Sequence, residues 1–219
     1  MQRHPSNKNL RILHGETFEG LPIMASKGPF IYEHLAKLKL TITRALGQYP
    51  RVFAFRCDLR FPADVQLSDQ VYSNAAIGDF MESFKFQIES NRNTAVQLNK
   101  DAHTSEVRYV WAREQGQGSR VHHYHLLILL NQDAFYTVGK LGSANANMFH
   151  RLEQAWAYAL RLPVASVQGL VEVPDNATYR IRRDDTIGQG ALFERSSYLC
   201  KSATKQFGNG YHVFDSSRN

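Results

Sequence analysis

Residues 120–130 read RVHHYHLLILL, and this stretch predicts the central strand of the fold. Successive side chains of a strand point to opposite faces, so His123 and His125 share one face while His122 and Tyr124 share the other. Two imidazoles held side by side on a stiff apolar strand are suited to bind a metal ion. The alternative is that one of the pair is a core histidine with its own hydrogen bonds, and that the other is there by chance.

A second strand is predicted just before this one, over residues 107–114 (VRYVWARE). A two-residue loop at Gly118-Ser119 between the strands suits a type II′ turn, which takes glycine first. A hairpin with this loop pairs residues whose numbers sum to 237, which places Glu114 directly opposite His123. Directly paired side chains lie about 4.5–5.5 Å apart at Cβ, close enough to share one metal ion.

The register of this hairpin decides whether Glu114 joins the histidine face. A four-residue loop would place Glu114 opposite Val121, still on that face, whereas a loop with an odd number of residues would turn it away. With an even loop, Glu114 joins His123 and His125 in a two-histidine, one-carboxylate set. Such a set leaves coordination positions open, which is typical of a catalytic divalent ion rather than a structural one. Otherwise Glu114 is a solvated hairpin residue.

Helices and further strands are predicted on both sides of the hairpin. Apolar residues spaced three to four apart predict helices around residues 31–46, 80–88, 148–159 and 190–207. Strands are predicted over 51–61, 169–173 and 177–183, while residues 1–29 look irregular. This order indicates an α+β fold, with a central antiparallel sheet of about five strands and flanking helices.

Composition excludes several classes of protein. The 219 residues, 43% of them hydrophobic, are enough for one well-packed domain, with or without an extension. Because no apolar run approaches the ~20 residues of a membrane helix and no signal peptide opens the chain, we expect a cytoplasmic protein. Cys57 and Cys200 are too far apart in sequence to form a Cys-x-x-Cys motif, and we expect free thiols in a reducing compartment.

The net charge of +6 is concentrated at one end of the chain. Residues 1–60 hold ten Lys and Arg against four acids, which accounts for the whole excess. A basic end of this kind suggests a polyanionic partner, although an ordinary solvated basic surface would give the same count.

Tyr198, on the last predicted helix, is a candidate nucleophile. On a helix over residues 190–207 it lies opposite the apolar face, with Lys201 and Lys205 beside it. A structural tyrosine is expected on or near the apolar face. Nearby cations favour a phenolate and can bind a phosphate. Tyr198 and Lys201 are therefore candidate catalytic residues, although exposed tyrosines beside lysines also occur by chance.

Together these motifs resemble those of the HUH endonucleases, the rolling-circle replication initiators and relaxases. The resemblance rests on a His-hydrophobic-His strand followed by a helical Tyr-x-x-Lys, with Glu114 one strand before the pair as in viral and plasmid initiators. The segments HHYHLLILLN (122–131) and YLCKSATK (198–205) are most similar to the inovirus-type replication proteins and their prophage-encoded relatives. The resemblance covers about residues 105–207.

The chain also departs from the pattern of that family. Residues 51–61 show no clear match to its first motif, and Tyr124 is less apolar than the usual residue between the two histidines. One tyrosine stands where some initiators have two. No Gly-rich nucleotide-binding loop follows, so a fused helicase is not expected.

The resemblance implies a Rep-like fold, with a divalent ion (Mg²⁺ or Mn²⁺) on one face of a five-stranded sheet and the tyrosine helix packed over it. We expect residues 51–219 to form this HUH domain and residues 1–50 to form a basic N-terminal extension with a helix. The implied partners are a single-stranded DNA origin, with a DNA hairpin as one form of it, and the helicase and polymerase of a bacterial host cell.

The implied reaction is site-specific nicking and rejoining of that DNA. Tyr198 attacks the scissile phosphate, which gives a 5′-phosphotyrosine and a free 3′-hydroxyl that primes synthesis. Lys201 stabilises the tyrosinate or holds the phosphate. Candidate contacts to other DNA phosphates are Lys205, Arg180, Arg182 and Arg183.

Two other functions fit parts of the sequence. The first is a non-catalytic DNA-binding regulator of a mobile element on the same fold, which has no need of Glu, His, Tyr and Lys at catalytic spacing. The second is a metal hydrolase of small molecules, which leaves Tyr198 and the basic end unexplained.

Overall fold

The computed structural model describes residues 1–116, 121–140 and 147–218, and it has the α+β architecture expected from the sequence. One antiparallel sheet runs in the order β10-β6-β8-β7-β11, with the short β9 paired to β6. The strands of this sheet are β6 (Arg51–Leu59), β7 (Arg108–Glu114), β8 (His123–Asn131), β9 (Val171–Glu172), β10 (Thr178–Arg182) and β11 (Phe214–Ser216).

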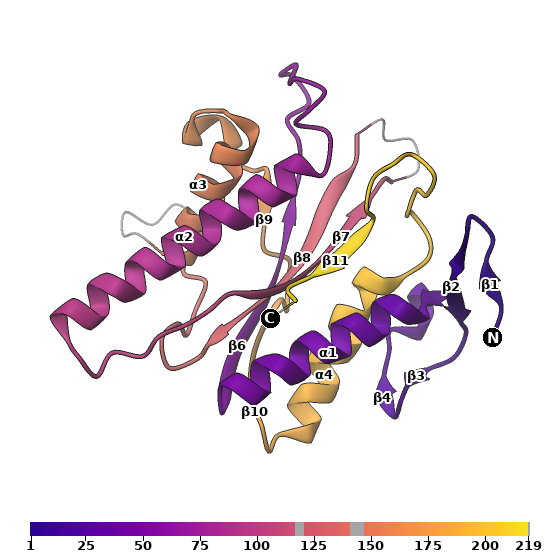
Figure 1. Cartoon of the computed structure of the whole chain (residues 1–219), viewed down its shortest axis with the longest axis horizontal. Helices are drawn as coiled ribbons and strands as arrows, with labels where there is room; N and C mark the ends of the chain where they lie inside the picture. Colours follow the sequence, from indigo (N-terminus) through magenta and orange to yellow (C-terminus); the bar gives the residue numbers. More distant parts are fainter. Residues whose placement is uncertain (117–120, 141–146, 219) are drawn as a thin grey trace.

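Helices cover both faces of this sheet, as Figure 1 shows. One face packs against α2 (Ala75–Leu98) and α3 (Met148–Leu160), and its core includes Trp111, Tyr124 and Trp156. The other face packs against α1 (Tyr32–Gln48) and α4 (Thr186–Ser197), where the core is smaller. Because β6 and β8 are covered on both faces, their apolar residues are nearly continuous rather than strictly alternating.

The first thirty residues contain short strands where the sequence pattern looked irregular. A three-stranded sheet joins β1 (Arg3–His4), β2 (Asn7–Leu13) and β5 (Phe30–Ile31), and a small hairpin joins β3 (Thr17–Phe18) to β4 (Leu21–Pro22). Phe18, Ile23 and Phe30 are buried in the same core as α1 and α4. Except for β2, these strands are two residues long, too short to show an alternating pattern, so their pairing depends on neighbours rather than on local sequence.

The prediction for the last helix was wrong at both ends. It begins at Thr186 because the Asp185 side chain accepts a hydrogen bond from the backbone of Gly188, which caps the helix. It ends at Ser197, and a 3₁₀ turn, η3 (Tyr198–Cys200), follows. Lys201 then adopts an extended backbone and pairs with Phe30 in an isolated β-bridge. A tertiary contact therefore ends the helix before its apolar spacing ends.

Two further expectations can be compared with the fold. Cys57 and Cys200 are both free and buried. In the described part of the chain, no helix is both long and apolar enough to cross a membrane. The remaining short elements are the 3₁₀ turns η1 (Ala25–Lys27) and η2 (Val164–Val167).

Candidate metal and tyrosine site

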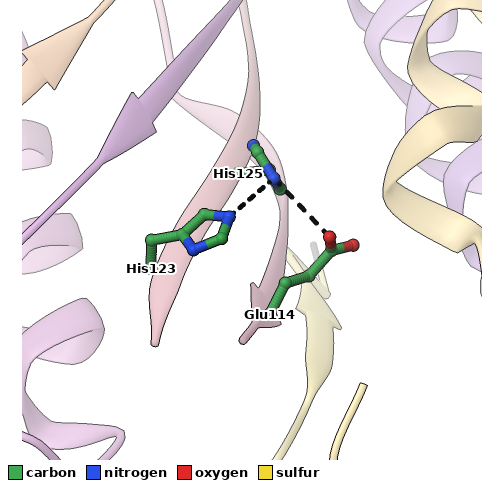
Figure 2. A group of neighbouring side chains, drawn as sticks. All are labelled: Glu114, His123 and His125. Carbon is green, nitrogen blue, oxygen red and sulfur yellow. Dashed lines mark hydrogen bonds and ion pairs between the residues drawn. The ribbon is translucent and has the colours of Figure 1, made fainter. Parts of the chain in front are cut away.

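The β7–β8 hairpin has the register expected from a two-residue loop. Glu114 lies opposite His123, and the same register continues to Arg108 opposite Leu129. The turn expected at Gly118-Ser119 falls outside the described residues. The pairing expected from it, with Glu114 opposite His123, is confirmed. Glu114 is thus on the histidine face of the sheet, where Figure 2 shows it with the two imidazoles.

The two imidazoles point toward each other. The Nε2 atoms of His123 and His125 are 3.1 Å apart, and the ring planes are nearly perpendicular. Two nitrogens that bind one ion at about 2.0–2.1 Å, with about 90–110° between the bonds, are roughly 2.8–3.4 Å apart. The histidines therefore fit a shared ion, and the same distance also suits an N–H···N hydrogen bond between neutral rings.

Asp58 fixes the orientation of His125. It lies opposite His125 on β6, and its Oδ1 is 2.7 Å from Nδ1 of His125. A carboxylate at Nδ1 keeps the proton there, so the lone pair of Nε2 remains available toward His123. Sequence reasoning missed Asp58. The available signal was an acidic residue near the end of a strand, RVFAFRCDL, that is mostly apolar and buried.

Glu114 is buried and already surrounded by donors. Its Oε1 accepts from Lys205 Nζ at 2.9 Å, and its Oε2 accepts from Lys201 Nζ at 2.8 Å and from the Thr204 hydroxyl at 2.8 Å. Oε2 is also 3.6 Å from Nε2 of His125. Burial would raise the pKa of this carboxyl, but the neighbouring cations, Lys205 foremost, outweigh burial and lower the pKa. Glu114 is therefore a carboxylate.

The structure corrects the expected position of Lys205. We expected it on an exposed helix face, in contact with DNA, but its side chain has 0% exposed area and ends on Glu114. The cause is the early end of α4, which leaves residues 201–205 free to turn inward toward β7. Burial lowers the pKa of Lys205, and the Glu114 carboxylate opposes that shift.

Tyr198 and Lys201 meet the histidine pair, although not on one helix as expected. The Tyr198 ring is half-buried and lies edge-on to His125, with 5.3 Å between ring centroids. Lys201 Nζ is 3.6 Å from the centre of the Tyr198 ring, and the guanidinium of Arg56 is 5.2 Å from it. Arg56 was also missed from the sequence. It is 3% exposed and lies 3.6 Å from Asp58.

The beginning of the chain holds the tyrosine segment in place. The backbone N–H of Met24 donates to the Ser197 hydroxyl at 2.9 Å, and that of Ser202 donates to the carbonyl of Pro29 at 2.8 Å. The Ser202 hydroxyl also hydrogen-bonds Nε2 of His4 at 3.0 Å. The division of the chain at residue 50 stays a prediction, but residues before it contact the site segment directly.

The expected arginine contacts lie away from this site. Arg180 stacks on Tyr136 at 3.8 Å, and Arg182 pairs with Asp184 at 3.1 Å. Arg183 donates to two carbonyls at the end of α1. Arg182 lies opposite the first residue of β6, seven residues from Asp58, which is roughly 23 Å at 3.3 Å per residue. Their role in binding DNA stays a prediction.

A pocket of about 410 Å³ lies beside the site and reaches His123. It opens where β6 ends and β8 begins, and one cation and several apolar side chains form its walls. Its lining residues are Arg60, Phe61, Pro62, Ala63, Val121, His122 and His123.

Most of the chain is similar to a known protein family. The model of the YagK/YfjJ C-terminal domain matches residues 13–217. The uncharacterized protein YagK of Escherichia coli K12 is 30% identical over 211 residues, which cover 93% of this chain and 98% of YagK. The uncharacterized protein YfjJ of the same strain is 30% identical over 192 residues, or 83% of this chain and 92% of YfjJ. No solved structure matches the chain significantly.

Proposed function

The chain belongs to the YagK/YfjJ C-terminal domain family, and we propose that it is a metal-dependent DNA endonuclease of the HUH type. In this proposal it nicks and rejoins single-stranded DNA at a specific site through a 5′-phosphotyrosine. The free 3′-hydroxyl left by the nick primes rolling-circle replication of a phage, a plasmid or another mobile element. The proposal includes the finer assignment of the sheet to the HUH fold.

One observation carries this proposal: the Tyr198 ring lies against His125, a member of the Glu114, His123 and His125 cluster. A hydroxyl nucleophile placed beside a candidate divalent-ion site is what phosphoryl transfer requires. The ligand atoms of the cluster lie within 4.8 Å of one another, and two imidazoles with one carboxylate suit a divalent ion that keeps open coordination positions. The resemblance to the HUH endonucleases makes Mn²⁺ or Mg²⁺ the expected ion. When bound, such an ion would polarise the scissile phosphate.

The other polar residues of the site have supporting roles in this reaction. Lys201 lies over the Tyr198 ring, where its ammonium can hold the scissile phosphate beside the attacking oxygen. Arg56 adds a second positive charge beside the same ring. Asp58 holds His125 in the tautomer that leaves Nε2 unprotonated. The phosphotyrosine stores the energy of the cleaved bond, so the 3′-hydroxyl can displace Tyr198 and reseal the strand.

The test is incubation with single-stranded DNA from the replicon or genomic island that carries the gene, in Mn²⁺ or Mg²⁺. We expect a protein–DNA adduct that survives a denaturing gel, and mass mapping should place it on Tyr198. Addition of EDTA should prevent its formation. Failure to form an adduct with single strands that cover both strands of that element would contradict the proposal.

A second candidate function is a DNA-binding regulator without nuclease activity. It is favoured by one observation, the saturation of both Glu114 oxygens by Lys201, Lys205 and Thr204. A buried network of charges can serve structure alone. If this function is correct, DNA affinity should fall as salt rises, no adduct should form, and removal of Mn²⁺ should leave the affinity unchanged.

A further inference from the structure

The two oxygens of Glu114 have different surroundings. Oε1 accepts from Lys205, whose side chain is completely enclosed. Oε2 lies 3.6 Å from Nε2 of His125, and it accepts from Lys201 at 2.8 Å. An ion shared with the histidines would therefore use Oε2, the oxygen that Lys201 binds.

An ammonium and a divalent ion on one oxygen repel each other strongly. The ion would lie about 2.0–2.2 Å from Oε2, and Lys201 Nζ lies 2.8 Å from the same atom. The two cations would then be at most about 5 Å apart, where charges in a partly buried site interact by several kcal/mol. One of them must leave or move away from this oxygen.

We propose that Lys201 and the divalent ion bind Oε2 of Glu114 in alternation, so that Lys201 is released when the ion is taken up. This inference rests on the proposed function and adds a coupling between the ion and the lysine beside the nucleophile. Lys201 is the lysine able to move, because its side chain is 9% exposed, whereas that of Lys205 is 0% exposed. Lys205 stays on Oε1 and keeps the carboxylate in place.

Release of Lys201 would change what surrounds Tyr198. Lys201 already lies 3.6 Å from the centre of the Tyr198 ring, so its ammonium needs no long movement to remain beside it. Once Glu114 no longer accepts from Lys201, that donor is available to the tyrosine oxygen or to a substrate phosphate. Tyr198 would therefore have the Lys201 ammonium available to its oxygen, or to the phosphate that it attacks, only after the ion is bound.

The first test uses the unmutated protein. Lysines are modified with an amine-reactive ester, with Mn²⁺ or with EDTA, and each site is quantified by mass spectrometry. We expect Mn²⁺ to increase the modification of Lys201 several-fold, while Lys205 stays protected and Lys39, paired with Glu19 on the surface, stays unchanged. If Mn²⁺ binds and Lys201 stays equally protected, the alternation is wrong.

The second test measures Mn²⁺ affinity by calorimetry for Lys201→Met, with Lys39→Met as the matched control. Removing the competing cation should tighten binding roughly five- to hundredfold, the usual range for coupled binding events. In a Glu114→Gln background, where the shared oxygen has lost its charge, Lys201→Met should have little effect. A persistent effect there would indicate general electrostatics and overturn the shared-oxygen argument. Should Lys201→Met fail to fold, the labelling experiment decides.

The outcomes separate this inference from the proposed function. If the unmutated protein binds Mn²⁺ and forms the adduct, but Lys201→Met leaves Mn²⁺ affinity unchanged, the alternation fails and the nicking function stands. If the unmutated protein neither binds Mn²⁺ nor forms an adduct, both fail.

Discussion

The two faces of the β7–β8 hairpin each carry a polar network, and the networks differ in how their histidines are used. On the α2–α3 face, Arg113 donates to Nδ1 of His122 at 3.1 Å, and Nε2 of His122 is 3.3 Å from the Tyr124 hydroxyl. That hydroxyl donates in turn to the carbonyl of Ser73 at 3.1 Å. Both ring nitrogens of His122 are therefore occupied. On the site face, the imidazoles turn one nitrogen each toward the other.

This difference shows that residue type alone does not define a metal site. Burial, with the charge of Arg113, lowers the pKa of His122 to about 3, and burial raises the pKa of Tyr124 to about 12. Both groups are thus held neutral and closed within the core. His123 begins β8 one residue later, and the alternation of faces places it beside His125, with one nitrogen of each ring turned toward the other. Variants on the two faces should therefore behave oppositely.

The largest expected difference is between the two tyrosines. Tyr198→Phe should abolish the covalent DNA adduct, because the attacking oxygen is lost, while single-stranded DNA affinity stays within roughly twofold. Tyr124→Phe should keep the adduct and lose about 1–2 kcal/mol of stability, because it removes the hydroxyl that binds Ser73. Denaturing gels and urea unfolding measure the two effects. An adduct that persists in Tyr198→Phe would refute the assignment of the nucleophile.

The next comparison concerns the histidines. His123→Ala should lose detectable Mn²⁺ binding and nicking, because one of the two convergent nitrogens is removed. His122→Ala should retain Mn²⁺ affinity but lose about 1–3 kcal/mol of stability, because Arg113 and Tyr124 lose a buried partner. Calorimetric titration with Mn²⁺ provides the readout. Equal loss of Mn²⁺ affinity in both variants would point to unfolding rather than to a ligand.

A smaller effect is expected when the partner of His125 is changed. Asp58→Asn should weaken Mn²⁺ binding roughly ten- to hundredfold, because the charge that orients the imidazole is lost. Asp215→Asn, which alters a surface ion pair with Lys37, is the matched control and should leave affinity unchanged. If both variants bound Mn²⁺ as tightly as the unmutated protein, the role of Asp58 would be purely structural.

The smallest effect is a difference in pH dependence. The pKa of His122 is lowered in the folded protein, so unfolding takes up a proton and stability falls as pH drops from about 6.5 toward 3. His122→Gln should flatten this slope by up to about 1.4 kcal/mol per pH unit within that window. The lowered pKa of Glu114 affects stability at lower pH. The stability that this carboxylate contributes is present above pH 4.5, its ordinary pKa, and is lost as pH falls from there through the lowered pKa. Glu114→Gln should therefore flatten the slope only below about pH 4.5.

Urea unfolding at pH 7, 5.5 and 4 distinguishes the two contributions. His122→Gln should change the difference between pH 7 and 5.5, whereas Glu114→Gln should leave that difference unchanged. The reverse order would mean that the two networks have been assigned the wrong protonation states.

The sequence predicted the parts of the site that depend on local periodicity. Strand alternation and loop parity are short-range properties, and they placed Glu114 and the histidines on one face. Asp58 depends on the pairing of β6 with β8, a contact between residues 67 positions apart, and no local pattern reports it. The α+β class was likewise recoverable, since apolar spacing indicated the helices and apolar runs indicated the central strands.

The tyrosine segment was mispredicted for a physical reason. The apolar spacing around Leu199 and Phe207 favours a continued helix, but the bridge from Phe30 to Lys201 imposes an extended backbone instead. That contact also turns Lys205 inward, so a lysine expected to meet DNA neutralises Glu114. Intrinsic helix preference is weak enough for such tertiary contacts to override it.

The hydrogen bonds between residues 4–29 and the segment 197–202, which holds Tyr198, have a consequence for biosynthesis. His4 and Ser202, which hydrogen-bond each other, are separated by 198 positions. A chain still emerging from the ribosome can present its histidine pair, yet it has neither the tyrosine nor the two lysines of the completed site. Even the finished polypeptide must bring both ends together, and contacts of such long sequence separation form late in folding. On the proposed function, unfinished or clipped copies would be unable to attach to the genome of the cell that makes them.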